Sequence, residues 1–489
     1  MRILAEKIEH IVVLMLENRS FDSMLGALYP KSAAFNGLTG QETNPVQNAA
    51  DVQVWNTTGT DIKSMSIPTP DPGELWTDIN MQLFGLDAQP GQQLPPMTGF
   101  ANNYIRQTAS PAQDYDAKNI MHYYQPEQVP VLSQLAKQYA VCDQWFASAP
   151  CQTWPNRFFV HTGTANGYQN NSPVHFPYLM PTIFNRLNTA NHSWGIFFHD
   201  FPQSLTLTDL WTHLEHFHFI DEFKTKAEAG ELPAYSFIEP RYFPDLELPN
   251  DQHPPHHVGL GEKLIAKVYN IVRSAPSWEK TLLIITYDEH GGCYDHAAPP
   301  VAIPPDNSNP SPFGFDRYGV RVPAVLISPY ISPGTILRVV EEGNLPHEGK
   351  TYPFDHTSIL ATLRNCFHLN TPLTNRDAVA PDVEKVFNLE APTNNALESI
   401  EALAYPIMDD ELKTALAAPM NDFQKALHQA AAHLPDLSQL ATTESELDKI
   451  EQHIQNLSNH LIKNIELPDH KTPSEALPFI KDKLQKFLP

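Results

Sequence analysis

The sequence has few cysteines, few basic residues and no long apolar run, and each shortage excludes a class of protein. Its 489 residues include only four cysteines, too few and too irregularly spaced for a disulfide framework or a C-x-x-C zinc site. We expect free thiols, with a Cys142–Cys151 pair as the alternative. Lys and Arg number 32 against 56 Asp and Glu. Because the basic residues are also scattered, no nucleic-acid partner is expected, and long-range attraction to anionic membranes is disfavoured.

No stretch approaches the ~20 consecutive apolar residues of a membrane-spanning helix, so we expect no transmembrane segment. The apolar run at 11–16 is too short for the core of a signal peptide, and Glu6 and Glu9 precede it. We therefore expect no Sec signal peptide, and a protein that is cytoplasmic or exported by a non-Sec route. Such a protein would contact lipid only at a membrane surface.

The apolar residues that are present favour a folded α/β protein. Residues 8–16 and 281–287 are β-branched apolar runs without helical period, which is typical of buried parallel strands. Residues 194–198 and 322–328 suggest further strands. Strands that alternate with helices indicate the α/β class. The expected helices cover 129–139, 154–161, 259–274 and 356–367.

Composition also divides the chain. We expect a main domain over 1–395, within which 34–118 is a loop-rich insertion near the site, because that segment is rich in Asn, Gln, Thr, Pro and Gly without steady periodicity. Residues 396–489 show apolar residues at helical spacing and predict a helical C-terminal domain. Its polar faces are not rich in Lys or Arg, so packing against the main domain is favoured over membrane binding.

Acidic and amide side chains follow the two clearest strands. Glu17 and Asn18 come directly after the first, and Asp288 and Glu289 after the strand at 281–287. Carboxylate and amide oxygens suit a divalent cation, and a cation is the simplest compensation for adjacent buried charges. Taken alone, the first segment is more typical of a turn with a capping serine than of a metal site. The neighbours His290, Asp295 and His296 are possible additional ligands, and Arg19 could instead pair with Asp22.

Thr153 is the nucleophile candidate. It precedes Trp154-Pro155, and the pattern predicts a helix N-cap with proline in the first turn. A helix start offers main-chain N–H groups and a positive dipole end to a phosphate. A threonine in this position is commonly only a cap, so the prediction depends on the acidic residues beside it.

Most of the 22 histidines are expected to be structural or exposed. His253 and His356 carry more weight, because each lies near an acid that could orient its ring, and His199 beside Asp200 is a weaker case. Without further context the expected role of each is a hydrogen-bonded structural group.

Taken together, four separated segments resemble the non-specific phospholipase C family, which also contains the AcpA-type acid phosphatases. The segments at 17–26, 153–157 and 319–329 fit the family patterns fully. The segment at 288–300 differs only in having Ala297 where valine is usual. The resemblance extends over roughly residues 8–385 and is strongest to the bacterial zinc-dependent phospholipases C. The segments are ENRSFDSMLG at 17–26, TWPNR at 153–157, DEHGGCYDHAAPP at 288–300 and GVRVPAVLISP at 319–329.

The resemblance implies an alkaline-phosphatase-like α/β/α sandwich, with the C-terminal helices as an appendage. It also implies an attacking hydroxyl on Thr153, and it matches a family histidine best at His253 and less securely at His199 and His356. Where the family often has another histidine this chain has Glu74, a possible metal ligand. The implied metal ligands are Glu17, Asn18, Thr153, Asp288 and Glu289.

The functional hypothesis is a metal-dependent phospholipase C that cleaves glycerophospholipids of the phosphatidylcholine or phosphatidylglycerol type at a membrane surface. A phosphomonoesterase with the same site is the alternative, and a non-catalytic metal-binding interaction protein is a remote one. Zinc is the first choice of metal on the resemblance, while oxygen ligands also suit calcium, manganese or magnesium.

Overall fold

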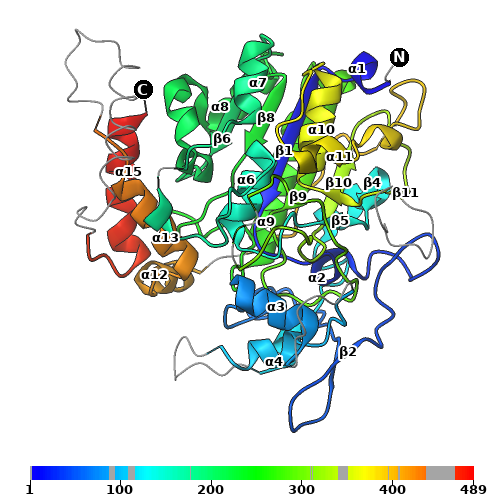
Figure 1. Cartoon of the computed structure of the whole chain (residues 1–489), viewed down its shortest axis with the longest axis vertical. Helices are drawn as coiled ribbons and strands as arrows, with labels where there is room; N and C mark the ends of the chain where they lie inside the picture. The colour runs from blue at the N-terminus through cyan, green and yellow to red at the C-terminus, as the bar shows by residue number, and fades with distance from the viewer. Residues whose placement is uncertain are drawn as a thin grey trace.

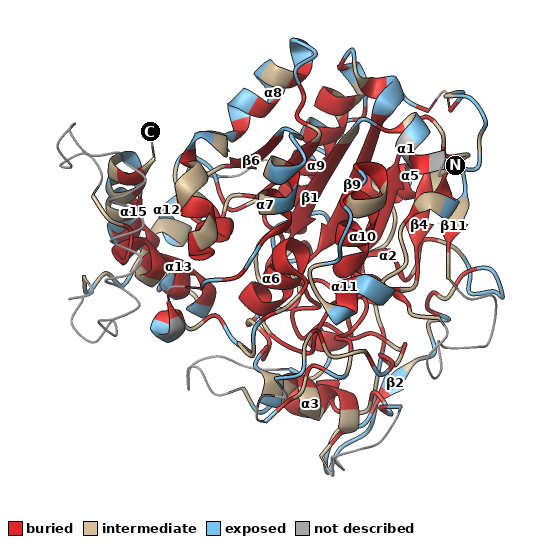
Figure 2. Cartoon of the chain, turned by 45° about the horizontal axis from the view of Figure 1, so that its top comes forward, coloured by how far each residue is buried: buried red, intermediate tan, exposed pale blue. Residues whose placement is uncertain are grey.

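The computed structural model shows one eight-stranded sheet between two layers of helices (Figure 1). Most residues of the sheet are buried, so the sheet forms the centre of the core (Figure 2). The predicted α/β class, with helices on both faces of the sheet, is confirmed. The described residues are 3–86, 94–107, 116–176, 178–308, 310, 312–339, 351–394, 396–405, 408–436 and 468–488.

The strands lie in the spatial order β11-β4-β10-β9-β1-β8-β6-β7. Neighbouring strands are parallel, except that β10 is antiparallel to both β9 and β4. All four predicted strands are present. The bounds are β1 His10–Leu16, β4 Ala140–Cys142, β6 Trp194–Phe198, β7 Phe217–Phe219, β8 Tyr235–Ile238, β9 Thr281–Tyr287, β10 Ala324–Ile327 and β11 Thr335–Leu337.

The central strand β1 pairs with β9 on one side and β8 on the other. Its run of Ile, Val and Leu suits a strand that is buried on both faces. The register places Leu16 beside Tyr287. Glu17 and Asp288 therefore leave the sheet next to each other, at the carboxyl edge where open α/β sheets build their sites.

Helices α5, α8 and α9 pack together on one face of the sheet, and α6, α7 and α10 lie on the other. The four predicted helices are present, each with ends within one residue of the prediction. The bounds are α1 Ile3–Lys7, α5 Pro130–Gln138, α6 Thr153–Thr162, α7 Ile183–Thr189, α8 Ile220–Glu228, α9 Val258–Ser274, α10 Thr357–Cys366 and α11 Asn375–Val379.

The segment predicted as loops at 34–118 contains short helices and strands. With Tyr294 and Val320 it forms a second apolar cluster that includes Ile79, Leu83 and Phe100. The segment lies beyond the carboxyl edge of the sheet, as Figure 1 shows for α3 and α4. The bounds, with the preceding helix, are α2 Phe21–Leu25, β2 Thr43–Asn44, β3 Val52–Gln53, α3 Trp76–Phe84 and α4 Phe100–Tyr104.

The C-terminal part supplies α12 Asp409–Ala417, α13 Asp422–Ala432 and α15 Pro473–Phe487. Phe423 of α13 and Phe487 of α15 belong to the same apolar cluster as the sheet, so these helices pack on the rest of the chain. The helical pattern at 445–465 lies outside the described residues. No helix in the described part of the chain combines the length and apolar character that a membrane span requires.

The four cysteines are all buried and unpaired, which confirms the expectation of free thiols.

Candidate active site

The polar residues that follow β1 and β9 are joined by hydrogen bonds. The main-chain N–H of Asn18 donates to Oδ1 of Asp288 at 2.9 Å, and its side-chain amide donates to Oε1 of Glu289 at 2.7 Å. Asn18 has a φ of 54°, a conformation that asparagine tolerates better than most residues. The turn at the end of β1 thereby brings the two strand ends into contact.

Thr153 lies beside this turn at the start of α6. Its Oγ1 is 3.4 Å from both Oε2 of Glu17 and Oδ1 of Asn18. The N-cap is Gln152, so the prediction that Thr153 caps the helix was wrong by one position, and Thr153 is the first helical residue. Its hydroxyl is therefore at the positive end of the helix dipole. The structure brings all five predicted residues into one buried group, here called the strand-end cluster: Glu17, Asn18, Thr153, Asp288 and Glu289.

Three residues that the sequence analysis did not assign to the site hold Glu17 in place. Arg157 forms an ion pair with Glu17, and its Nε is 3.5 Å from Oδ2 of Asp288. Gln203 donates to Oε1 of Glu17 at 2.8 Å, and the carbonyl of Asp251 accepts from the Glu17 N–H at 2.9 Å. The spacing of Arg157, four residues after Thr153 on one helix, could have revealed it.

A second group, here called the rim group, consists of Asp71, Glu74 and His253. One ligand atom from each lies within 4.8 Å of the others. Glu74 also accepts from the Asn18 side-chain amide at 2.7 Å, which joins this group to the strand-end cluster. His253 donates from Nδ1 to the Pro254 carbonyl at 2.6 Å, and its Nε2 is 3.6 Å from Oε1 of Glu74.

The strand-end cluster and the rim group contain more buried carboxyl groups than nearby positive charges can neutralise. Burial raises the pKa of Glu17, and Asp288 raises it further while Arg157 opposes the shift. Burial and the neighbouring Asp288 likewise raise the pKa of Glu289. Burial and Glu289 raise the pKa of Glu74. So many buried carboxyl groups cannot all ionise without a further positive charge.

Buried carboxylate oxygens without a hydrogen bond fit a divalent cation. Among the described residues Oδ2 of Asp288, Oδ2 of Asp251 and Oδ1 of Asp71 accept no hydrogen bond, although each is buried. Carboxylate and amide oxygens are the donors that hard cations prefer, and the nearby His253 would also admit zinc. Both the strand-end cluster and the rim group therefore offer residues that could hold a metal ion.

The raised pKa values predict how a metal alters stability. In the metal-free protein the folded state binds more protons than the unfolded state above pH ~4.5, so its free energy of unfolding falls as pH rises. A divalent cation bound to these carboxylates would replace those protons and would bind more tightly as they leave. We expect the rise in Tm on adding Zn²⁺ to be larger at pH 8 than at pH 5 in thermal denaturation. A rise that is equal at both pH values would contradict this.

His356 and His199 do not join either group. His356 lies 2.5 Å from the Asp288 carbonyl through Nε2, and its Nδ1 accepts from the Trp145 indole at 3.4 Å, so both ring nitrogens are occupied. His199 donates from Nδ1 to the Glu239 carbonyl at 3.0 Å. Burial lowers the pKa of each to about 4. Neither ring is oriented by its adjacent acid as the sequence suggested.

Asp295 and His296 belong to an ion-pair network around Arg321. The guanidinium of Arg321 contacts Asp295 at 3.0 Å and Asp22 at 2.9 Å, and His296 Nδ1 lies 2.6 Å from Asp22. Asp22 therefore pairs with Arg321 rather than with Arg19. The network joins α2 to the segment after β9 and supports the fold beside the site.

His290 lies directly behind Glu289. Its Nδ1 is 3.2 Å from Oε2 of Glu289, and its Nε2 is 2.8 Å from the side-chain oxygen of Gln82. Burial lowers the pKa of His290 to about 3. The His290 ring thus contacts the Glu289 carboxylate, and this position fits a role in orienting that carboxylate.

A mostly parallel sheet that gathers buried carboxylates and one hydroxyl at a helix start defines a candidate hydrolase of phosphoric esters. Comparison with known sequences agrees with this class. The chain belongs to the phosphoesterase family, whose profile matches residues 8–370. Membership of this family makes it an enzyme that acts on phosphoric ester bonds.

Two plant proteins and one bacterial protein illustrate the relationship. Non-specific phospholipase C1 of Arabidopsis thaliana is 37% identical, with 98% of this chain and 86% of that protein covered. Non-specific phospholipase C6 of Arabidopsis thaliana is 39% identical over 87% of this chain and 81% of its own length. Phospholipase C A of Mycobacterium tuberculosis is 28% identical over 82% and 80%.

A comparison with solved structures finds a weaker likeness than these three sequence relatives show. The lipoteichoic acid synthase LtaP from Listeria monocytogenes has a TM-score of 0.33 and 14% sequence identity, with 55% of this chain and 71% of that chain covered. A likeness this low carries no argument about the site.

Proposed function

We propose that this phosphoesterase is a metal-dependent phospholipase C that uses Thr153 as its nucleophile. The observation that supports this most is the position of the Thr153 hydroxyl, 3.4 Å from Glu17 and from Asn18, at the start of α6. The relatives named phospholipase C in plants and bacteria support the substrate class, a glycerophospholipid such as phosphatidylcholine or phosphatidylglycerol. The products are diacylglycerol and the phosphorylated head group.

The residues proposed to hold the metal are the strand-end cluster, with Glu74 as a possible further ligand. Zinc is our first choice because His253 lies close by, while calcium, manganese and magnesium also suit the oxygen atoms. A bound divalent cation would compensate the carboxylates, lower the pKa of the Thr153 hydroxyl and polarise the phosphoryl oxygens.

In the first step Thr153 Oγ1 attacks phosphorus and the bond to the glycerol oxygen breaks. Glu17 is the nearest carboxylate to accept the hydroxyl proton, since its Oε2 lies 3.4 Å away. The positive end of α6 stabilises the equatorial phosphoryl oxygens. The result is a phosphothreonine diester and a leaving alkoxide that needs a proton.

His253 is the proposed proton donor to that leaving oxygen. Its Nδ1 is held by the Pro254 carbonyl, so Nε2, which faces Glu74, is the atom that exchanges protons. Burial lowers the pKa of His253 to about 4 and raises that of Glu74, so while Glu74 is not bound to the metal the proton rests on Glu74 before substrate binds. As the glycerol oxygen leaves, this proton passes from Glu74 to Nε2 of His253 and from Nε2 to the leaving oxygen. In the second step Nε2 accepts a proton from the water that attacks the phosphothreonine.

The test is a comparison of substrates with added metals. Protein stripped with a chelator is expected to lose turnover of phosphatidylcholine and phosphatidylglycerol, and to regain it most fully with Zn²⁺. A simple aryl phosphate monoester assayed in parallel distinguishes the phosphomonoesterase alternative, which predicts the higher kcat/KM on the monoester. Full turnover after chelation, with no metal left in elemental analysis, would overturn the metal-dependent scheme.

A further inference from the structure

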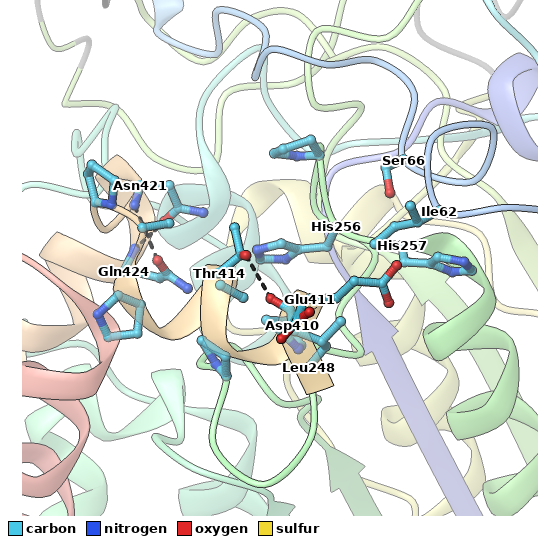
Figure 3. A pocket seen from close by; sticks show the side chains of 17 residues that line it. Ile62, Ser66, Leu248, His256, His257, Asp410, Glu411, Thr414, Asn421 and Gln424 are labelled. Atoms are coloured by element: carbon cyan, nitrogen blue, oxygen red, sulfur yellow. Dashed lines mark hydrogen bonds between the residues drawn. The ribbon is translucent and has the colours of Figure 1, made fainter. Parts of the chain in front are cut away.

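A pocket of about 500 Å³ lies between the C-terminal helices and the loops that lead into α9 (Figure 3). This volume is within the range of ~300–1,000 Å³ that is typical of small-molecule sites. Its lining includes the segment around Leu248, the segment around His256, helix α12 with Ala415, and the start of α13. No function assigned above uses this pocket.

The chemistry of the lining favours an apolar occupant. Its walls include Pro244, Leu248, Pro249, Pro255, Ala415 and Ala418. Two of its polar side chains already have partners within the protein: the amide of Gln424 donates to the Tyr242 carbonyl at 2.8 Å, and the hydroxyl of Thr414 donates to the Asp410 carbonyl at 2.7 Å. Figure 3 shows the carboxylates of Asp410 and Glu411 among the lining side chains. Two carboxylates disfavour an anion such as a phosphate.

The pocket shares its wall with the catalytic centre. His256, which lines the pocket, hydrogen-bonds through Nδ1 to Oδ1 of Asp251 at 2.7 Å, and the carbonyl of Asp251 accepts from the Glu17 N–H. The His256 and His253 rings are 5.9 Å apart between centroids. One short segment, 251–257, therefore touches the pocket on one side and the phosphate site on the other.

Helix α13 also contacts both the pocket and His253. Its N-cap Asn421 and its residue Gln424 line the pocket, while the ring of Phe423 between them lies parallel to the His253 ring at 6.0 Å. A ligand bound with its phosphorus near Thr153 would thus find an apolar cavity one side-chain layer from the leaving-group position.

We propose that this pocket binds the acyl chains of the lipid substrate, and so places the glycerol oxygen beside His253. The inference rests on the proposed phospholipase C function and adds the part of the substrate that the C-terminal helices recognise. Each methylene buried in such a pocket strengthens binding roughly fourfold. In the wild type, kcat/KM for phosphatidylcholines dissolved as monomers should rise steeply with acyl length until the pocket is filled.

The test fills the pocket and compares substrates with and without chains. Ala415→Trp on α12 projects into the cavity, and Leu248→Trp does so from another wall. Each is expected to lower the ratio of kcat/KM on dihexanoyl phosphatidylcholine to that on p-nitrophenyl phosphorylcholine by about tenfold or more, the loss of two or more buried methylenes. The matched control is Ala417→Trp, on an exposed position of the same helix outside the pocket, which should keep the wild-type ratio.

A wild-type ratio in both pocket variants would overturn the proposal, whether kcat/KM is unchanged on both substrates or falls equally on both. Calorimetry with dioctanoylglycerol separates this proposal from the phospholipase C function. Saturable binding to the wild type that Ala415→Trp abolishes supports the pocket even if no phospholipid is hydrolysed. Absence of binding, in an enzyme that cleaves phospholipids, contradicts the pocket alone.

Discussion

Replacing Thr153 with alanine is expected to lower kcat on a phosphodiester substrate by about a thousandfold or more, because the attacking oxygen is lost. Thr153→Ser keeps the hydroxyl at the start of α6 and should restore measurable turnover. The comparison is made by steady-state kinetics on p-nitrophenyl phosphorylcholine with saturating Zn²⁺.

The matched control is Thr162→Ala at the other end of α6. The Thr162 hydroxyl is also buried, but its one hydrogen lies within reach of the main-chain carbonyls of Phe158 and Thr164, at 2.9 and 2.7 Å from the hydroxyl oxygen. We expect Thr162→Ala to lower Tm and to leave kcat within a few-fold. A Thr153→Ala enzyme that is no slower than Thr162→Ala would refute the nucleophile.

Asp288→Asn is expected to weaken metal binding by about a hundredfold or more and to lower kcat in parallel. The asparagine oxygen can still accept the main-chain N–H groups of Asn18 and Glu289, which Oδ1 of Asp288 accepts at 2.9 and 2.7 Å. What the substitution removes is one buried negative charge. The metal-free variant should therefore unfold at a higher temperature than the metal-free wild type, while its Tm responds less to Zn²⁺ in the same titration.

Asp200→Asn provides the comparison for a buried aspartate at the end of another strand of the same sheet. Asp200 accepts three main-chain N–H groups, from Phe201, Tyr242 and Phe243, each at 2.8 Å. Because these contacts hold it away from the strand-end cluster, Asp200→Asn should leave the Zn²⁺ affinity unchanged. Equal losses of affinity in Asp200→Asn and Asp288→Asn would show that the effect is not specific to the cluster.

Two short apolar runs made the centre of the sheet predictable. The strands β1 and β9 are seven residues each, and their β-branched composition is enough to identify them. By contrast β4, β7 and β11 have three residues each, too few to show a period, and only pairing with their neighbours defines them. The short helix α3 was missed for a similar reason, since it lies within a segment rich in turn residues.

Site residues that directly follow a strand or begin a helix could be predicted from the sequence. Glu17 and Asp288 follow recognisable strands, and the parallel register alone brings them together. Asp71 and Asp251 come from loops and Gln203 from a short 3-10 helix, and the positions of all three depend on tertiary contacts that no local pattern encodes. The expected pairing of each histidine with its neighbour in sequence failed at His356 because a buried ring bonds to whatever is close in space.

The stereochemical course at phosphorus tests the central claim, attack by Thr153, most directly. A phosphatidylcholine analogue made chiral at phosphorus by sulfur substitution is hydrolysed in isotopically labelled water, and the configuration of the phosphorylated head group is determined. Two successive displacements, first by Thr153 and then by water, predict retention of configuration. Inversion would mean that water attacks the lipid directly, and it would contradict the account.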